Sequence, residues 1–284
     1  MSGLIALIDG SIYSQSVCDH AAWAAARTGA PVEVLHVLGR RDITSEPVNL
    51  SGSIGLGARS ALLEELTELD AQRAKLAQKR GRIILDEAKV RLHEDGVDTV
   101  TTRLRHGDLV DTVMEFGAAA DLIVVGKRGE AADFAKLHLG SNLERVVRST
   151  HRPVLVAARA FRPVKRFLIA FDGGTSAMKA VDHVARSRLF AGLECRLLTV
   201  GADTPEARKR LDDAATLLRA ASYDVTADIE PGQPEAAIAR RVETDAIDLL
   251  VMGAYGHSRI RSLIIGSTTT EMIRSCMIPV ALFR

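Results

Sequence analysis

Short apolar runs alternate along the chain with longer stretches in which apolar residues recur at helical spacing. In the C-terminal half, the runs predict strands at residues 166–170, 195–200, 224–229, 248–252 and 279–283. The stretches between them predict helices at residues 175–191, 204–222, 234–244 and 267–275. Several of these strands are continuously apolar, which is typical of a parallel sheet covered by helices on both faces. The alternation of strand and helix therefore predicts a doubly wound α/β domain.

The same pattern occurs twice. The first half opens on LIALIDGS, with Asp9 after the apolar run, and the second on FLIAFDGG, with Asp172. An Asp-His pair follows at the same distance in each half and ends at His20 and at His183. Further on, DLIVVGKRG matches DLLVMGAYG, and HRPVLVA matches MIPVALF. A repeat of this kind predicts two tandem domains with the same fold.

The first copy is longer than the second because of an insertion at about residues 39–95. The insertion begins with a Gly/Ser-rich loop, and residues 58–95 are then rich in Ala, Leu, Glu, Lys and Arg at helical spacing. We expect a long amphipathic helix there, with its charges on the solvated face. The predicted domains span residues 1–160 and 164–284, joined by a short linker.

Composition excludes several classes of function. Hydrophobic residues make up 47% of the chain and charged residues 26%, as in a soluble globular protein. The net charge of +1 and the aromatic content of 4% do not favour binding to nucleic acid or to a membrane surface. The three cysteines lie far apart without metal-ligand spacing, and no signal peptide or membrane-spanning run is apparent. We expect a cytoplasmic protein with no metal site.

The segment GAYGHSRIRSLIIGSTTT carries the candidate chemistry. Gly253 follows a predicted strand, Gly256 comes three residues later, and Gly266 precedes Ser267 and Thr268 at the start of a predicted helix. Glycines let the backbone approach phosphate closely, and the first turn of a helix offers free N–H groups to an anion. The alternative interpretation is ordinary turn and cap chemistry. Neither GxxxxGK[ST] nor GxGxxG occurs in the chain.

The spacing G-x2-G-x9-G-[S/T], between DLLVMG and IPV, resembles the nucleotide-binding signature of the universal stress protein family. The resemblance implies a five-stranded parallel sheet in each domain and a site for ATP, with or without Mg²⁺. It also implies that the glycine loop holds phosphates and ribose, that the Asp after strand one lies beside the nucleoside, and that the end of strand two meets adenine. By position, these roles fall on Asp172, Val200, Gly253, Gly256, Gly266, Ser267 and Thr268.

The first copy departs from this signature. Ten residues, rather than nine, separate Gly129 from Gly140. The loop holds Lys127 and Arg128, which are candidates to bind phosphate, and the acidic residues Glu130 and Asp133, which would repel it. We therefore expect a weaker second site there. Its residues would be Asp9, Val37, Gly126, Gly129, Gly140 and Ser141.

The remaining polar candidates are assigned structural roles. Asp9 and Asp172 are candidates for capping the helix that follows each of them, an alternative that stays open beside contact with a ligand. His20 and His183 are expected to pack, and His36 to support the core. Cys18 precedes the Asp19-His20 pair, but no second thiol or oriented base is evident nearby, which disfavours a thiol nucleophile.

The leading hypothesis is an ATP-binding stress-response protein of regulatory type, whose bound state an unidentified protein partner senses. The sequence shows no positioned base, paired carboxylates or metal cluster, so no catalytic residue is assigned and at most slow ATP hydrolysis is expected. The alternatives are an ATP-using enzyme, such as a nucleotidyl transferase or ligase, and a binding module for another small molecule.

The last strand of each half is expected at a sheet edge, where an apolar strand favours pairing. We therefore expect the two halves to pack through their fifth strands as a pseudo-dimer within one chain. Whether the long helix mediates a further homodimer stays open.

Overall fold

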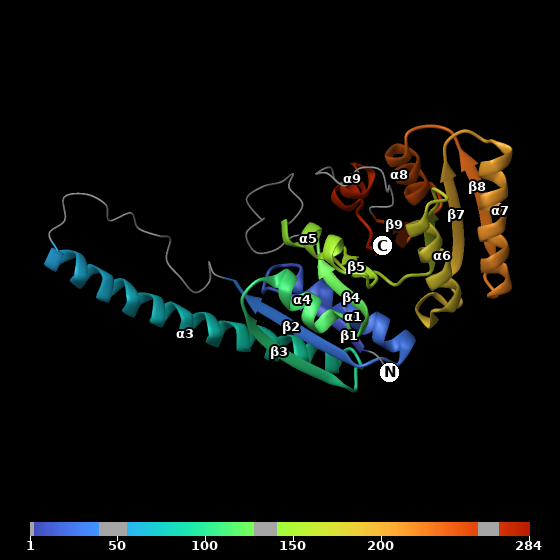
Figure 1. Ribbon diagram of the computed structural model, residues 1–284. Helices are drawn as coiled ribbons and strands as arrows, with labels where there is room; N and C mark the ends of the chain where they lie inside the picture. Colours follow the sequence, from blue (N-terminus) through green and yellow to red (C-terminus); the bar gives the residue numbers. More distant parts are fainter. Residues whose placement is uncertain (1–2, 40–55, 128–140, 255–266) are drawn as a thin grey trace.

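The computed structural model describes residues 3–39, 56–127, 141–254 and 267–284 (Figure 1). The first half contains β1 (Gly3–Ile8), α1 (Ser14–Thr28), β2 (Val32–Leu38), α3 (Leu56–Glu94), β3 (Val100–His106), α4 (Leu109–Gly117), β4 (Ala120–Gly126), α5 (Ser141–Ser149) and β5 (Val154–Ala157). The second half contains β6 (Arg166–Ala170), α6 (Thr175–Arg186), the 3₁₀ turn η2 (Arg188–Phe190), β7 (Glu194–Val200), α7 (Pro205–Ala220), β8 (Val225–Glu230), α8 (Pro234–Thr244), β9 (Leu249–Gly253), α9 (Ser267–Ser275) and β10 (Val280–Phe283).

The described strands form one ten-stranded sheet in the order β3-β2-β1-β4-β5-β10-β9-β6-β7-β8. Within each half, five strands run parallel to one another. In both halves the first strand lies between the second and the fourth, which is a doubly wound arrangement. The predicted fold class, two tandem α/β domains, is confirmed.

The two halves meet at an antiparallel pair of strands, β5 and β10. Val156 lies opposite Val280, and Leu155 lies opposite Ala281. Each of these four side chains is at most 3% exposed. Pairing removes an apolar edge from each half and satisfies its backbone N–H and C=O groups. The expected pairing through the fifth strands is confirmed.

Helices cover both faces of the sheet, and the core on each face crosses the seam between the halves (Figure 1). Helices α1, α3, α6 and α7 pack on one face, whose core includes Leu155 from one half and Phe283 from the other. Helices α4, α5, α8 and α9 pack on the opposite face, whose core includes Val156 and Leu282. Because both apolar layers are shared, the halves bury surface against each other as well as within themselves.

Two long cationic side chains cross the seam. Arg27, near the end of α1, donates to the carbonyl of Leu189 in η2. Lys127, which follows β4 and is buried, donates to the carbonyl of Cys276 just after α9. A cation at the C-terminal end of a helix is favoured by the helix dipole. Both contacts tie one half to a backbone carbonyl of the other.

The helix predicted at residues 175–191 ends earlier, at Arg186, and this boundary was wrong. Ser187 takes up an extended conformation with a ψ of 131° and accepts a hydrogen bond from the N–H of Leu189, which starts the 3₁₀ turn. A serine side chain that competes for backbone donors in this way favours a helix end over a helix interior.

Helix α3 confirms the predicted long helix of the insertion. Its C-terminal part packs on β2 and β3, and Arg91 Nε lies 2.6 Å from Asp19 Oδ1 on α1. Gly81 allows this close packing, because a Cβ at that position would lie 2.8 Å from Leu104 Cδ1 and 3.0 Å from His36 Cδ2. The N-terminal part of α3 extends well beyond the sheet (Figure 1).

The register of the seam can be tested with paired cysteines. Opposite residues in an antiparallel pair have Cα atoms about 4.5–5.5 Å apart, which a disulfide can span. We expect Val156→Cys with Val280→Cys to form an intramolecular disulfide, detected by mass spectrometry after proteolysis between the halves. Val156→Cys with Ala281→Cys is the matched control, because adjacent residues of a strand point to opposite faces. A disulfide in the control but not in the first pair would contradict the register.

Candidate functional site

Strands β6, β7 and β9 end at the same edge of the sheet. Ala170 of β6 pairs with Leu198 of β7 on one side and with Met252 of β9 on the other. Asp172, Val200 and Gly253 lie one or two residues beyond these pairs, so the structure brings these three predicted site residues to one edge. The edge includes the switch point between β6 and β9, where doubly wound sheets bind ligands.

A tight turn follows β6. Asp172 is exposed, and its Oδ1 accepts a hydrogen bond of 2.8 Å from the N–H of Gly174, which is the N-cap residue of α6. Gly173 has a φ of +72°, a conformation that favours glycine. The carboxylate thus stabilises the turn before α6 through one of its oxygens. Asp9 does the same in the first half, because its Oδ1 accepts from the N–H of Ser11 at 3.0 Å.

Gly253, at the end of β9, lies close to the backbone of α6. A Cβ added to this glycine would lie 2.8 Å from the backbone N of Ala177 and 3.0 Å from the backbone C of Ser176. The sequence interpretation assigned the glycine to close approach of phosphate. The structure supplies a separate reason for it, because a side chain would push the first turn of α6 away from the sheet. A substitution of Gly253 therefore tests packing before it tests binding.

Arg210 is a site residue that the sequence analysis missed. It is exposed on α7, and its Cδ, Nε and Cζ lie 3.2, 3.3 and 3.6 Å from the position of a Cβ built on Gly173. A guanidinium therefore lies over the turn that carries Asp172, where it adds positive charge to the strand-end edge. Nothing in the local sequence singles out Arg210 among the charged residues of α7. Only the packing of α7 against the end of β6 selects it.

The corresponding turn in the first half lies beside both an apolar and a cationic side chain of α3. Gly10 has a φ of +78°, and a Cβ built on it would lie 2.6 Å from Cδ1 of Ile84 and 3.8 Å from Nη2 of Arg80. Lys127, which the sequence analysis offered as a phosphate ligand, is buried and donates to the Cys276 carbonyl of the other half. That interpretation of Lys127 was wrong, because the lysine serves the contact between the halves.

Part of each predicted glycine loop lies outside the described residues. Gly129 and Gly140 of the first loop, and Gly256 and Gly266 of the second, belong to segments 128–140 and 255–266. Helices α5 and α9 begin at Ser141 and Ser267, as the motif predicts. The roles of these glycines, of Gly126 and of Ser141, Ser267 and Thr268 stay predictions. Val37 pairs with Arg105 of β3, just as Val200 pairs with Glu230 of β8.

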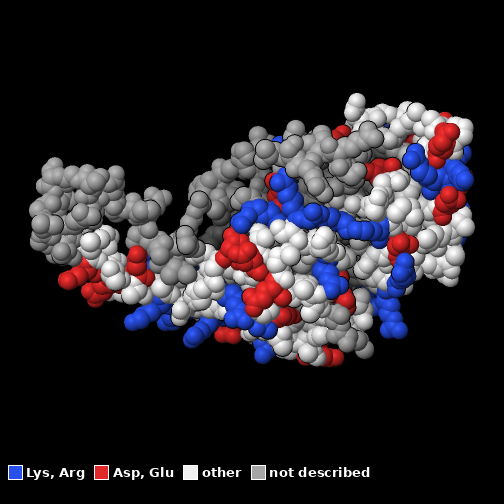
Figure 2. Space-filling view, in the orientation of Figure 1, with Lys and Arg blue, Asp and Glu red and all other residues white. Residues whose placement is uncertain are grey.

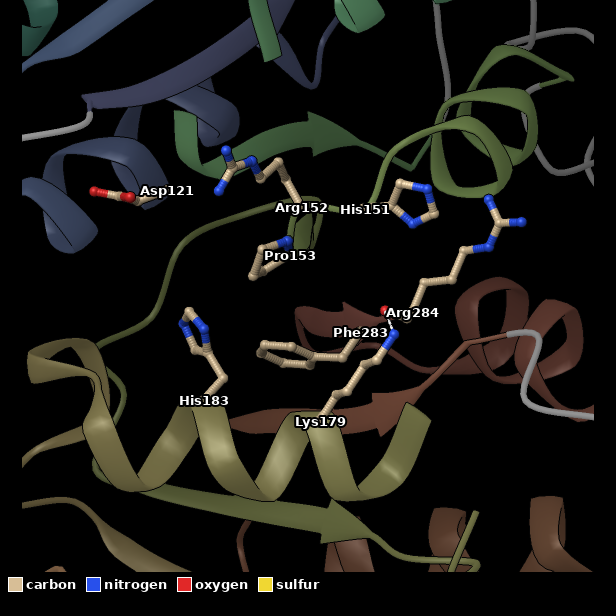
Figure 3. Close-up of a pocket in the computed structure, with 8 residues that line it drawn as sticks. All are labelled: Asp121, His151, Arg152, Pro153, Lys179, His183, Phe283 and Arg284. Atoms are coloured by element: carbon tan, nitrogen blue, oxygen red, sulfur yellow. Dashed lines mark hydrogen bonds between the residues drawn. The ribbon is translucent and has the colours of Figure 1, made fainter. Parts of the chain in front are cut away.

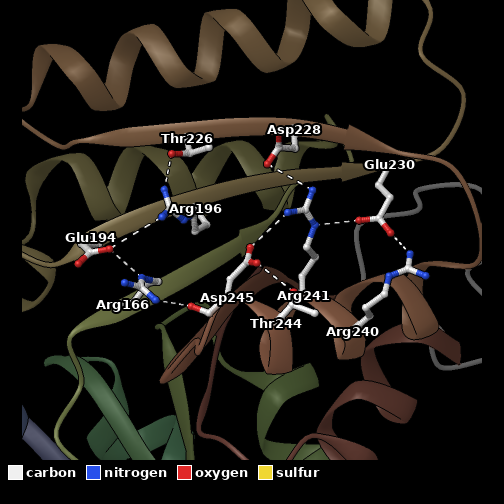
Figure 4. Close-up of polar contacts among 10 residues, drawn as sticks. All are labelled: Arg166, Glu194, Arg196, Thr226, Asp228, Glu230, Arg240, Arg241, Thr244 and Asp245. Atoms are coloured by element: carbon white, nitrogen blue, oxygen red, sulfur yellow. Dashed lines mark hydrogen bonds and ion pairs between the residues drawn. The ribbon is translucent and has the colours of Figure 1, made fainter.

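A network of ion pairs fixes α8 against the end of β8 (Figure 4). Glu230, near the carboxyl end of β8, binds Arg240 through one oxygen and Arg241 through the other, the latter at 2.9 Å. Arg241 also lies 3.4 Å from Asp228 and 3.3 Å from Asp245. Because carboxylates surround Arg241, we assign it to holding α8 in place rather than to binding an anion.

A groove of about 330 Å³ lies at the seam between the halves (Figure 3). It is lined by Asp121, His151, Arg152, Pro153, Lys179, His183, Phe283 and Arg284. The His183 ring packs against Phe283 with centroids 5.0 Å apart, and Lys179 Nζ donates to the Arg284 carbonyl at 3.1 Å. The groove adjoins the start of β4 and β5, because β10 runs antiparallel to β5. It is therefore separate from the switch point between β6 and β9.

The predicted packing roles of the histidines agree with their surroundings. His20 is fully buried, its Nδ1 lies 2.6 Å from the Ser16 carbonyl, and its ring meets Phe161 edge-on at 5.1 Å. His36 Nδ1 lies 2.8 Å from the Ile8 carbonyl. Burial lowers the pKa of His20 and of His183, which keeps both imidazoles neutral.

The cysteine thiols are buried and unpaired. Burial, together with the charges of Asp19 and Asp95 and against the opposing effect of Arg91, raises the pKa of Cys18 to about 12. Burial likewise raises the pKa of Cys195 to about 12. A thiol that stays protonated at neutral pH is a poor nucleophile. This agrees with the sequence interpretation of Cys18.

The fold and the strand-end turns define a tandem, doubly wound α/β protein. The universal stress protein family matches residues 4–158 and 201–284. A universal stress protein of Synechocystis sp. is 40% identical over 287 aligned residues, which cover 100% of both chains. A solved universal stress protein from Archaeoglobus fulgidus has a TM-score of 0.76 at 20% identity and covers 100% of this chain and 98% of its own. The chain belongs to the universal stress protein family.

A second structure, a universal stress protein from Pseudomonas aeruginosa described as putative, has a TM-score of 0.61 at 17% identity, over 100% of this chain and 93% of its own. Both structural likenesses extend over the two halves, and both concern the fold alone. Among the described residues, no helix is long and apolar enough to cross a membrane.

The lowered histidine pKa values predict a loss of stability in acid. A histidine whose pKa is lower in the folded state binds more protons when the chain is unfolded. The free energy of unfolding should therefore fall as the pH drops below about 6.5, the pKa expected in the unfolded chain. His183→Gln should reduce this fall between about pH 7 and pH 5, measured by urea denaturation. His151→Gln is the control, since His151 is exposed, and an equal effect of both substitutions would contradict the assignment.

Proposed function

We propose that this universal stress protein is an ATP-binding stress-response protein of regulatory type, with its principal site at the strand-end edge of the second domain. The observation that carries the proposal is the convergence of Asp172, Val200 and Gly253 at the switch point, with Arg210 beside the Asp172 turn. A proposed domain boundary at residues 160–164 leaves this edge within the second domain.

The described residues fit an adenine nucleotide in two respects. An exposed carboxylate at Asp172 offers acceptors to ribose hydroxyls, and the guanidinium of Arg210 offers charge-assisted donors to phosphate. The backbone at Val200 would recognise adenine without a special side chain. Ser267, Thr268 and the glycines of the loop before them would hold phosphate, with Mg²⁺ as an accompanying ion. The negative charge of the ATP triphosphate would attract Arg210 and the helix N-terminus at Ser267, and so would stabilise the segments at this edge.

A regulatory role is favoured over catalysis by the surroundings of the titratable groups. His183 is neutral and packs on Phe283, and the thiols are buried and protonated. The arginines on α8 are paired with carboxylates. An unidentified protein partner would sense the ATP-bound state. Unpaired cysteines suit a reducing compartment, and we place the protein in the cytoplasm.

Calorimetry tests the ligand and the site together. The full chain should bind ATP with micromolar affinity, more tightly than AMP, with a stoichiometry nearer one than two per chain. Ser267→Ala should weaken binding by about 1 kcal/mol, or about fivefold, the cost of a lost hydrogen bond. The absence of any heat with ATP, together with no adenine nucleotide in the protein as isolated, would refute the proposal.

The contribution of Arg210 can be separated from the charge of α7 as a whole. Arg210→Ala should weaken ATP binding by about 1 kcal/mol or more, because a charge-assisted contact is lost. Arg208→Ala is the matched control, since Arg208 lies on the same helix and its Nε donates to Asp203 at 3.0 Å. Equal losses in both variants would indicate a general charge effect and would remove Arg210 from the site.

A turnover assay separates this proposal from an ATP-using enzyme. Phosphate release from ATP should be far slower than the about 10 s⁻¹ typical of enzymes, because no described group is positioned as a general base. Turnover at an enzymatic rate would favour the alternative of a nucleotidyl transferase or ligase. Tight binding of a different small molecule would favour a binding module.

A further inference from the structure

The N-terminal part of α3 extends beyond the sheet as an arm (Figure 1). The arm reaches back to the domain at Gln78, whose Nε2 lies 3.5 Å from His106 Nε2 of β3. Its sequence carries an apolar stripe. An apolar residue recurs at every seventh position, namely Leu62, Leu69, Leu76, Ile83 and Val90. The last four are 45%, 68%, 49% and 57% exposed, respectively. Single exposed leucines are common on protein surfaces, but a run with seven-residue spacing keeps to one side of a helix and supplies one of the two seam positions that a coiled coil repeats in each heptad. Leu66 occupies the second seam position beside Leu62 and Leu69.

On the C-terminal part of α3, the side of the helix opposite the stripe also carries apolar residues, and these pack on the domain. Leu85, Ala88 and Leu92 are buried against the sheet and α1. Ile83 and Val90 therefore face away from the domain, in line with the leucines of the arm. Packing within the domain leaves the stripe uncovered by the residues that the structure describes.

Charges along the arm are segregated into two blocks. The acidic block, residues 64–70, contains Glu64, Glu65, Glu68 and Asp70 and no basic residue. The basic block, residues 73–82, contains Arg73, Lys75, Lys79, Arg80 and Arg82 and no acidic residue. Figure 2 shows acidic atoms near the free end of the helix and basic atoms closer to the body of the molecule.

Like charges within each block repel one another in a helix that stands alone. Glu64 and Glu68 are four residues apart, as are Lys75 and Lys79, and like charges at this spacing destabilise a helix. A second helix that placed basic groups beside the acidic block, and acidic groups beside the basic block, would relieve both repulsions. An antiparallel copy of the same helix does so, whereas a parallel copy would oppose like charges along the whole arm.

We propose that the α3 arm forms an antiparallel coiled coil with the α3 arm of a second copy of this chain. The two-fold axis would pass between residues 72 and 73, so that Leu69 of each copy lies beside Leu76 of the other. Overlap of residues 62–83 covers about three heptads, or about 33 Å of helix, which is enough for a specific coiled coil. The two sheets then lie at opposite ends of a shared rod.

The apolar stripe is tested with the full chain in analytical ultracentrifugation. The wild type should be a dimer at about 100 µM, and Leu69→Gln with Leu76→Gln should convert it to a monomer without loss of helical circular dichroism. Ala71→Gln is the matched control, because residue 71 is about 200° around the helix from Leu69. A monomeric wild type, a dimer that survives the double substitution, or an equal loss in the control would overturn the proposal.

Orientation is tested by reversing charge. Changing Arg73, Lys75 and Lys79 to glutamate should abolish the dimer, since the acidic block of the partner would then meet acidic residues. Changing Glu64, Glu65 and Glu68 to lysine in the same chain should restore it. In a parallel dimer, each basic block faces the basic block of the partner, and the change to glutamate would replace this repulsion with one between acidic residues. A dimer that is as stable after this change as before it would therefore overturn the antiparallel arrangement. Added salt should weaken the wild-type dimer.

Discussion

The antiparallel pairing of β5 with β10 is the constraint on which the rest of the structure depends. A five-stranded parallel sheet ends in an apolar strand whose outer N–H and C=O groups need partners. In the two-domain chain, the edge strand of each half pairs with the edge strand of the other. The apolar core then continues from one half to the other, for example through Val156 and Leu282. The contacts of Arg27 and Lys127 with carbonyls of the other half follow from this joint.

Residues at matching positions of the two repeats have different partners, in part because of the contact between the halves at β5 and β10. Lys127 in the first glycine segment is drawn into the contact with the Cys276 carbonyl, whereas the matching position in the second half is Ala254, which is buried after β9. The repeated Asp-His pairs have also diverged. Asp19 binds Arg91 of α3, while Asp182 lies 3.5 Å from Arg186 of its own helix. Residues at matching positions of the repeat thus contact different parts of the structure.

The helix between the second and third strands differs most between the halves. In the first half it is α3, which brings Ile84 over the Gly10 turn and continues outward as an arm with an uncovered apolar stripe. In the second half it is the shorter α7, which brings Arg210 over the Gly173 turn. The Gly10 turn thus lies beside Ile84 and Arg80, whereas the Gly173 turn lies beside Arg210. The insertion therefore bears on both the proposed nucleotide site and the proposed assembly.

The sequence by itself determined the repeat, the edge position of the fifth strand in each half, the long helix and the strand-end positions of Asp172 and Gly253. These features depend on local periodicity and on turn residues, which a linear pattern carries. Only the tertiary structure decided that Gly253 is needed by α6, that Lys127 serves the seam, that Arg210 reaches the Asp172 turn and that α6 ends at Arg186. Such contacts join residues far apart in the chain, so their partners depend on how helices pack on the sheet.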